Sequence, residues 1–162
     1  MHCEVVPLAH EEPFRYKRPE SVLVVVYTRT GRVLLLKRAD HDDFWQSVTG
    51  ALDWSEHDPR AAAVRELREE TGLEVEAAAL RDLGLVQQYE ILPQWRRRYA
   101  PEVRYNTERA YALELPEEVR LALHPEHTEY GWFDFPAALE RVASWSNRAA
   151  IERLAREHRG AG

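Results

Sequence analysis

Glu66, Glu69 and Glu70 fall within about one turn of a predicted helix, in the stretch GALDWSEHDPRAAAVRELREETGL at residues 50–73. The 66/69 and 66/70 spacings put like charges side by side, which costs roughly 0.2–0.5 kcal/mol per pair. The carboxylates also crowd the C-terminal turn, where the helix dipole disfavours anions. Divalent cations such as Mg²⁺ prefer oxygen ligands and would remove this repulsion. A solvated helix of mixed charge fits the same spacing equally well, so spacing alone leaves both interpretations open.

A helix over residues 59–71 would hold these carboxylates in position. Asp58 can cap its N-terminus, Pro59 suits the first helical position, and Gly72 suits the left-handed residue just past its end. The side of the helix that would face the core is a narrow apolar stripe of Ala63, Val64 and Leu67.

The stretch resembles the signature box of the Nudix hydrolases: Gly, five residues, Glu, seven residues, then Arg-Glu-U-x-Glu-Glu-x-Gly-U, where U is aliphatic. Residues 65–73, RELREETGL, match every specified position. Gly50 and Glu56 match the first half, but eight residues separate Glu56 from Arg65. Counted back from Arg65, His57 takes the place of the first Glu. We expect the loop before the helix to absorb the extra residue, which keeps the three glutamates in register.

The resemblance implies an α/β protein with the Nudix-type α/β/α sandwich, in which helices flank a mixed β-sheet. It also implies a pyrophosphohydrolase that acts on phosphoric anhydrides with Mg²⁺, or alternatively Mn²⁺, as cofactor. Such ions neutralise phosphate oxygens and lower the pKa of bound water. Glu66 and Glu70 form the best ligand pair, and Glu69 is a further ligand or the general base. The implied catalytic residues are Arg65, Glu66, Glu69 and Glu70.

Strings outside the box resemble one bacterial subfamily, which hydrolyses dihydroneopterin triphosphate in folate biosynthesis and is also described as acting on dATP. The strings lie at residues 16–19, 43–50, 98–101, 106–108 and 144–148, and the similarity spans residues 16–155. The resemblance implies Glu126 as a third metal ligand outside the helix. The implied substrate-binding residues are Lys17, Arg38, Thr49, Tyr89, Glu90, Ile91, Leu92, Trp145 and Ser146.

Simpler roles compete for several of these residues. Lys17 and Arg38 have the character of ordinary cations at strand ends. Trp45 and Trp145 fit a core as well as a stacking platform, although an indole face suits a flat pterin or purine. The histidines in HPEH at residues 124–127 are expected at the surface rather than on a metal, because Mg²⁺ prefers oxygen.

Composition limits the other functions. With 162 residues and one cysteine, Cys3, the chain predicts one domain in a reducing compartment, without disulfides. No signal peptide is evident, and the longest apolar run, residues 22–27, is too short to cross a bilayer. We expect a cytoplasmic protein with an N-terminal arm at 1–15, a hydrolase domain at 16–158 and a C-terminal tail at 159–162. Its predicted partner is a small-molecule triphosphate, with no membrane or obligate protein partner.

Charge is distributed unevenly. The net charge of −6 argues against non-specific nucleic-acid binding, and no nucleic-acid partner is expected. A cationic block nevertheless occurs at Arg96, Arg97, Arg98 and Arg104. It is either a solvated surface run or a set of phosphate contacts, since arginine binds phosphate oxygens in a bidentate way.

Hydrophobic patterning predicts the elements around the helix. Strands are expected at residues 21–28, 32–38, 45–52, 80–92, 107–115 and 130–133, with a loop at 93–104. Two later helices are expected at 136–142, opening at Pro136, and at 147–158, capped by Ser146.

Two rival functions remain at this point. One is the same chemistry on dATP or another nucleoside triphosphate. The other is a Nudix-like protein that binds nucleotides without turnover. Its only support is the extra residue between Glu56 and Arg65, whereas the three retained glutamates oppose it.

Overall fold

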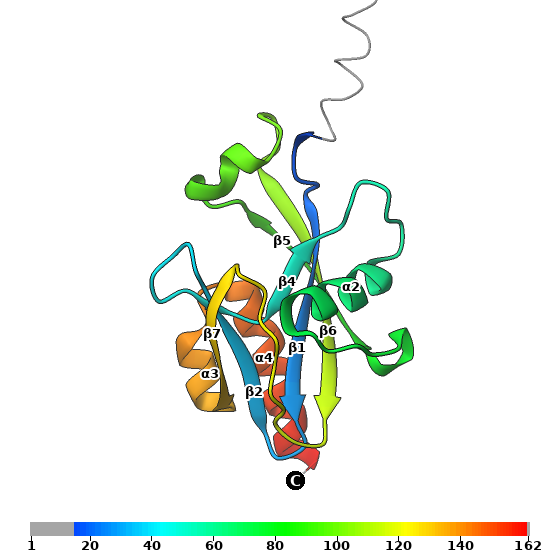
Figure 1. Ribbon diagram of the computed structural model, residues 1–162, viewed down its shortest axis with the longest axis vertical. Coiled ribbons are helices and arrows are strands. Elements are labelled where there is room, and N and C mark those ends of the chain that lie inside the picture. Colours follow the sequence, from blue (N-terminus) through cyan, green and yellow to red (C-terminus); the bar gives the residue numbers. More distant parts are fainter. Residues whose placement is uncertain (1–14, 162) are drawn as a thin grey trace, which may run out of the picture.

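The computed structural model describes residues 15–161, so the predicted arm at 1–15 lies outside the described residues except for Arg15, and Cys3 lies outside them altogether. Seven strands form one mixed sheet in this part of the chain (Figure 1). They are β1 (Glu20–Thr28), β2 (Arg32–Arg38), β3 (Trp45–Gln46), β4 (Val48–Ala51), β5 (Arg81–Glu90), β6 (Tyr105–Leu115) and β7 (His127–Asp134). None of the helices within residues 15–161 has the length and apolar character needed to span a membrane.

Strand β1 is the centre of the sheet. It pairs in parallel with β6 along its whole length, and in antiparallel fashion with β2 at Tyr27↔Val33 and with β4 from Ser21 to Val24. Strand β1 therefore pairs with β2 near its C-terminal end and with β4 near its N-terminal end. Because β2 and β4 diverge, the sheet is open at the end where β1 begins.

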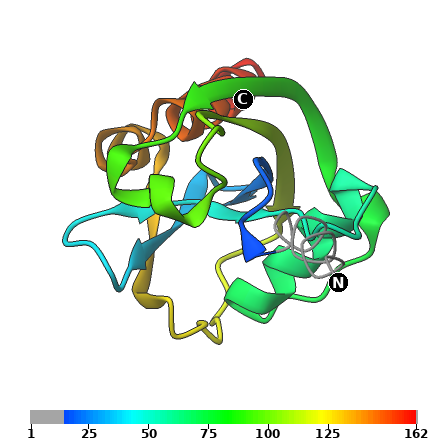
Figure 2. The same cartoon turned by 90° about the horizontal axis from the view of Figure 1, so that it is seen from above.

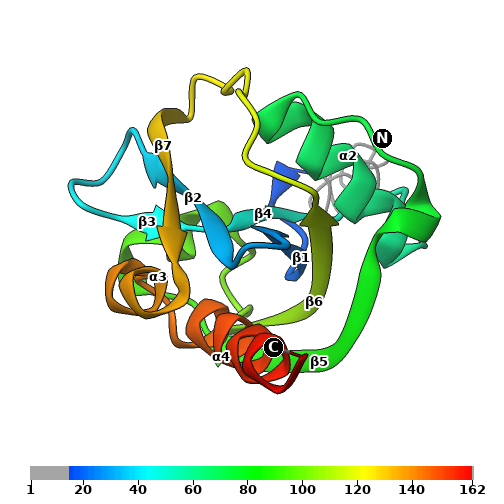
Figure 3. The same ribbon diagram turned by 90° about the horizontal axis from the view of Figure 1, so that it is seen from below.

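The β-branched sequence of β1 supplies two cores at once, because successive side chains of a strand point to opposite faces. Val22, Val24 and Val26 pack toward helix α2 (Pro59–Thr71). The alternate residues pack toward helices α3 (Phe135–Arg141) and α4 (Trp145–Ala161). Seen from below, α2 lies on one side of the sheet and α3 with α4 on the other (Figure 3). The predicted α/β/α sandwich is confirmed.

Helix α2 begins and ends where the sequence predicts. The Asp58 side chain accepts a hydrogen bond from the Arg60 backbone N–H, and Gly72 adopts φ 80°. Gly72 has the left-handed conformation that glycine adopts at little cost. The register of Glu66, Glu69 and Glu70 is therefore set by local signals at both ends of the helix.

Several elements differ from the prediction. The segment expected as one strand at 45–52 divides into β3, which pairs with β2, and β4, which pairs with β1. The loop expected at 93–104 contains the 3₁₀ segment η2 (Pro93–Arg98), which lies at the end of the molecule where β1 begins (Figure 2). Helix α3 starts one residue before Pro136 and is capped by Asp134, whose carboxylate accepts from the Ala137 N–H.

The start of α4 corrects the prediction that Ser146 caps it. The Ser144 Oγ accepts from the Asn147 backbone N–H, so Ser144 takes the capping role. Ser146 instead lies inside the first turn and is buried. The helix also continues past His158 to Ala161, into the segment expected as a tail.

Candidate active site

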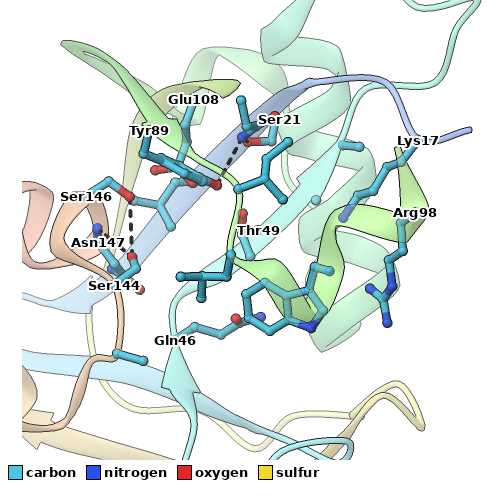
Figure 4. Close-up of a pocket in the computed structure, with 18 of the residues that line it drawn as sticks. Lys17, Ser21, Gln46, Thr49, Tyr89, Arg98, Glu108, Ser144, Ser146 and Asn147 are labelled. Carbon is cyan, nitrogen blue, oxygen red and sulfur yellow. Dashed lines mark hydrogen bonds between the residues drawn. The ribbon is translucent and has the colours of Figure 1, made fainter. Parts of the chain in front are cut away.

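A cavity of about 480 Å³ occupies the open end of the sheet (Figure 4). Its lining comes from strands β1 to β6, from α2 and η2, and from the start of α4. Among the lining residues are twelve of the predicted ones: Lys17, Arg38, Thr49, Glu66, Glu70, Tyr89, Glu90, Ile91, Leu92, Glu126, Trp145 and Ser146. Arg65 and Glu69 are not part of the lining.

Arg65 joins helix α2 to the loop before it. Its Nε and Nη2 donate to Glu56 Oε2 and Oε1, both at 2.9 Å. Its Nη1 donates to Glu66 Oε2 at 3.0 Å and to Glu69 Oε1 at 3.1 Å. His57 is exposed. The loop therefore absorbs the extra residue as expected, and Glu56 rather than His57 pairs with Arg65.

Glu66 and Glu70 project from one face of α2 into the cavity. Burial, followed by the neighbouring Glu70 carboxyl, raises the pKa of Glu66 to about 8. Burial likewise raises the pKa of Glu70 to about 8. Two buried carboxylates one helical turn apart share a proton readily, and a hard divalent cation can take the place of that proton.

Gly50 makes room for this pair. A Cβ atom at position 50 would overlap the Glu66 carboxyl group, so only glycine allows the side chain to lie against β4. This cradle and the two buried carboxylates fit a bound divalent ion. Glu126 lies nearer the surface, with 71% of its side chain exposed. No three His, Cys, Asp or Glu side chains within residues 15–161 are grouped tightly enough to form a metal site, so Glu126 stays a predicted third ligand.

His127 corrects the expectation that both histidines of the HPEH segment lie at the surface. His124 is exposed, but only 2% of the His127 side chain is, because β7 begins three residues earlier than predicted. Its Nε2 lies 3.0 Å from Glu70 Oε1. Burial lowers the pKa of His127, which favours a neutral ring that donates from Nε2 to the carboxylate. His127 is thus a support for Glu70.

Three cations line the cavity. Burial, and then the charges of Arg98 and Arg38, lower the pKa of Lys17. Arg38 is held by Asp40 in a bidentate pair at 2.8 and 2.7 Å, and Arg98 lies 3.6 Å from the same carboxylate. An anionic ligand would relieve the crowding of these cations, and phosphate groups suit arginine and lysine. Lys17 and Arg38 thus lie together at the cavity and stay predicted substrate-binding residues.

Arg98 was predicted only as one member of the cationic block. Within that block Arg98 lines the cavity, whereas Arg96, Arg97 and Arg104 do not. Arg98 is the last residue of the 3₁₀ segment η2, and the turn of this segment places Arg98 at the cavity (Figure 4). The sequence signal was present as a run of arginines, but it did not show which one faces inward.

The two tryptophan candidates, Trp45 and Trp145, differ clearly in their exposure. Trp45 is buried in the core, with its ring 5.6 Å from that of Phe133. Trp145 is 56% exposed at the cavity, and its ring stands edge-on to Tyr89 at 6.3 Å. Sequence reasoning missed Trp95, whose ring lies 5.0 Å from the Arg38 guanidinium. Trp145 and Trp95 are the indoles available to a flat ligand.

The remaining predicted residues lie along β4 and the end of β5. The Thr49 hydroxyl donates to the Val22 carbonyl at 3.0 Å, Glu90 is exposed, and Ile91 is buried. The prediction missed further polar residues of the lining, four of which lie on the sheet. They are Ser21, Gln46, Asn106 and Glu108.

The α/β/α sandwich, with the glutamates of α2 at the open end of its sheet, agrees with the family that the signature box implies. The NUDIX domain family model matches residues 17–154, and the chain belongs to this family. Nudix hydrolases generally use divalent metal ions.

Two curated relatives and one solved structure are similar over most of the chain. The dihydroneopterin triphosphate diphosphatase of Escherichia coli K12 is 48% identical over 86% of this chain and 93% of its own. The Haemophilus influenzae protein of the same name is 39% identical over 86% of this chain and 89% of its own. The structure of the E. coli dihydroneopterin triphosphate pyrophosphohydrolase matches with a TM-score of 0.80 and 47% identity, over 85% of this chain and 95% of that one.

Proposed function

We propose that this protein is a magnesium-dependent pyrophosphohydrolase that cleaves dihydroneopterin triphosphate. The products are dihydroneopterin monophosphate and pyrophosphate. One observation carries the proposal: a single cavity contains buried carboxylates, three cations and an exposed indole, which together suit a metal, a triphosphate and a flat ring. The 48% identity to the E. coli diphosphatase supports the same choice. We keep the cytoplasmic location predicted from the sequence as part of this proposal.

In the reaction, water attacks one of the two phosphorus atoms that share the α–β bridging oxygen. The bond from that phosphorus to the bridging oxygen breaks, and a proton of the water is released. Bound Mg²⁺ supplies charge neutralisation at the phosphate oxygens and lowers the pKa of water. Glu66 and Glu70 would hold it after losing their shared proton, and Glu126 is the proposed third ligand.

The chain's own cations would bind and orient the phosphates. Lys17, Arg38 and Arg98 line the same cavity as the glutamates, so a triphosphate held by them lies within reach of the metal. Their bonds to a chain of non-bridging oxygens fix the scissile bridge in place, and such positioning is a major part of phosphoryl-transfer catalysis.

Glu69 has a different environment from its two neighbours. Its carboxylate accepts from Arg65 and is 46% exposed, outside the cavity lining. The predicted roles of metal ligand or general base therefore require it to turn away from Arg65. In its observed position it holds the Arg65 guanidinium against Glu56 and Glu66.

Binding without turnover has lost its only sequence support, because Glu56 reaches Arg65 despite the extra residue. Hydrolysis of dATP remains the alternative substrate assignment. Initial rates with dihydroneopterin triphosphate, dATP and the other deoxynucleoside triphosphates, at equal concentration and with saturating Mg²⁺, test the proposal. We expect the pterin substrate to give the highest kcat/KM. A higher value for any nucleotide would reject the substrate assignment, and no pyrophosphate release from any of them would reject the enzyme.

A further inference from the structure

Polar side chains from four elements meet in the buried part of the cavity (Figure 4). Asn106 Nδ2 donates to Ser21 Oγ at 2.7 Å and to Tyr89 Oη at 3.0 Å. Glu108 lies two residues further along β6, on the same face of the strand, beside Ser146 and Tyr89. Asn106 and Glu108 are 2% and 4% exposed. None of these residues belongs to the metal-binding helix.

Two acceptor oxygens of this group have no hydrogen-bond partner within the part of the chain that the structure describes. Asn106 Oδ1 and Glu108 Oε1, here called the acceptor pair, accept no hydrogen bond from the described residues. Nor does any cationic side chain within residues 15–161 form an ion pair with Glu108. A buried acceptor left without a donor costs about 1–3 kcal/mol, and more when it is charged. Both side chains line the cavity although the two oxygens themselves are buried, so a ligand can supply the missing donors once the side chains turn toward it.

A purely structural role explains these residues less well. Strand β6 continues on the same face with Ala110 and Ala112, which pack in the core without polar atoms. Small apolar side chains at 106 and 108 would extend that core without an unpaired oxygen. Burial raises the pKa of Glu108 to about 7, while the hydroxyls of Ser146 and Tyr89 oppose the shift, so a substantial fraction is ionised at neutral pH. A donor that approaches Oε1 would favour the ionised form further.

We infer that Glu108 is a specificity-determining residue, and that the acceptor pair binds the N–H groups of a 2-amino-4-oxopyrimidine ring. This inference rests on the proposed function, whose pterin substrate carries that ring. The N3–H and the 2-amino group of this ring are two neighbouring donors on one edge. They match the two acceptor oxygens of Asn106 and Glu108. Hydrogen bonds to a carboxylate are about twice as strong as neutral ones.

Adenine presents a different edge. Its N1 is an acceptor beside the 6-amino group, so an adenine ring would set a lone pair against the Glu108 carboxylate. Guanine shares the donor edge of the pterin. The acceptor pair therefore selects for pterin and guanine rings over adenine, independently of the triphosphate that both kinds of substrate carry.

Glu108→Gln tests the inference, because it keeps the shape and replaces one acceptor oxygen with a donor. We expect KM for dihydroneopterin triphosphate to rise about 10- to 100-fold, as for a lost charge-assisted hydrogen bond, with a smaller change in kcat. The activity with dATP should fall less or improve, because an amide complements the adenine edge. Binding of dihydroneopterin itself, which has no phosphates, to the Mg²⁺-loaded protein should weaken by a similar factor.

Glu114→Gln is the matched control, since Glu114 lies on the same strand outside the cavity and pairs with Arg29 at 3.1 Å. It should leave both KM values unchanged. Thermal melting of both variants checks folding. An unchanged KM and an unchanged pterin-to-dATP ratio in a folded Glu108→Gln protein would overturn the inference while the proposed function stands.

A comparison of dGTP with dITP needs no variant and separates the inference from the proposed function. These nucleotides differ by the 2-amino group alone. We expect wild-type protein to have the lower KM for dGTP, whether or not the pterin proves to be the preferred substrate. Equal KM values for the two would overturn the role of the acceptor pair, even if dihydroneopterin triphosphate is hydrolysed.

Discussion

The cavity has two regions that both contain buried carboxyl groups, yet their surroundings differ. In the proposed metal region, Glu66 and Glu70 lie side by side, supported by Arg65 and His127, and charged groups surround them. In the proposed ring region, Glu108 has no ionic partner among residues 15–161 and lies among hydroxyl and amide groups. Burial raises the pKa of the carboxyl groups in both places. A pair of like charges suits a cation, whereas a single acceptor among dipoles suits an N–H donor, so the neighbours decide what each carboxyl group binds.

The largest expected effect comes from the metal region. Glu70→Gln removes a negative ligand while keeping the size of the side chain. We expect Mg²⁺-dependent kcat to fall by at least about 100-fold. This fall is larger than the one expected when a residue that only supports a metal ligand is lost. The fold should persist, because the change also relieves repulsion from Glu66. Steady-state assays and thermal melting measure both quantities. Glu74→Gln, at an exposed position just past α2, is the control and should behave as wild type. Equal activity of Glu70→Gln and wild type would refute the metal role of this helix.

An intermediate effect is expected from the support of the metal region. Glu56→Gln weakens the bidentate contact that holds Arg65 beside Glu66, so kcat should fall about 10- to 100-fold, as for other residues that orient metal ligands. His57→Gln should change neither kcat nor the melting temperature, since His57 is exposed. Kinetic assays of the two variants show whether Glu56 or His57 acts as the first glutamate of the signature box. A larger loss in the His57 variant than in the Glu56 variant would contradict the observed pairing.

The smallest expected effect lies in the ring region. Trp145→Ala removes an exposed indole from the cavity border, so KM for dihydroneopterin triphosphate should rise about 3- to 10-fold, consistent with an aromatic contact of about 0.5–1.5 kcal/mol. The kcat and the melting temperature should remain near wild type. Hydrolysis of inorganic tripolyphosphate, which has no ring, separates the two regions: its KM should not respond to this change. If both substrates are affected equally, the division between the regions is wrong.

Features set by neighbouring residues could be predicted from the sequence. The ends of α2 follow from Asp58, Pro59 and Gly72, and the hydrophobic pattern of β1 follows from its unbroken run of β-branched residues. With both ends of the helix in place, the three glutamates fall in register. The resemblance added residues from distant parts of the chain, and twelve of those it implied line one cavity.

Features set by distant partners could not be predicted in this way. The segment at 45–52 divides because β2 and β1 each take a different half of it, and no local signal marks that exchange. The burial of His127 depends on its pairing with β2 at Arg38. Glu108 had a usable signal, because alternation along β6 puts it in phase with Ala110 and Ala112 on the core face. A carboxylate in that phase indicates a buried site.

The binding of Mg²⁺ tests the central claim most directly, namely that a buried pair of carboxyl groups exchanges a proton for a cation. Because burial raises the pKa of both Glu66 and Glu70, ion binding must displace one or two protons at neutral pH and none well above the raised pKa values. Isothermal titration of the full chain with MgCl₂ should therefore show affinity that increases by about tenfold per pH unit for each proton displaced, up to about 100-fold, and that levels off at higher pH, with proton release detected in buffers of different ionisation enthalpy. Glu70→Gln should bind far more weakly at every pH. Affinity that is independent of pH, or that is equal in wild type and Glu70→Gln, would contradict the claim.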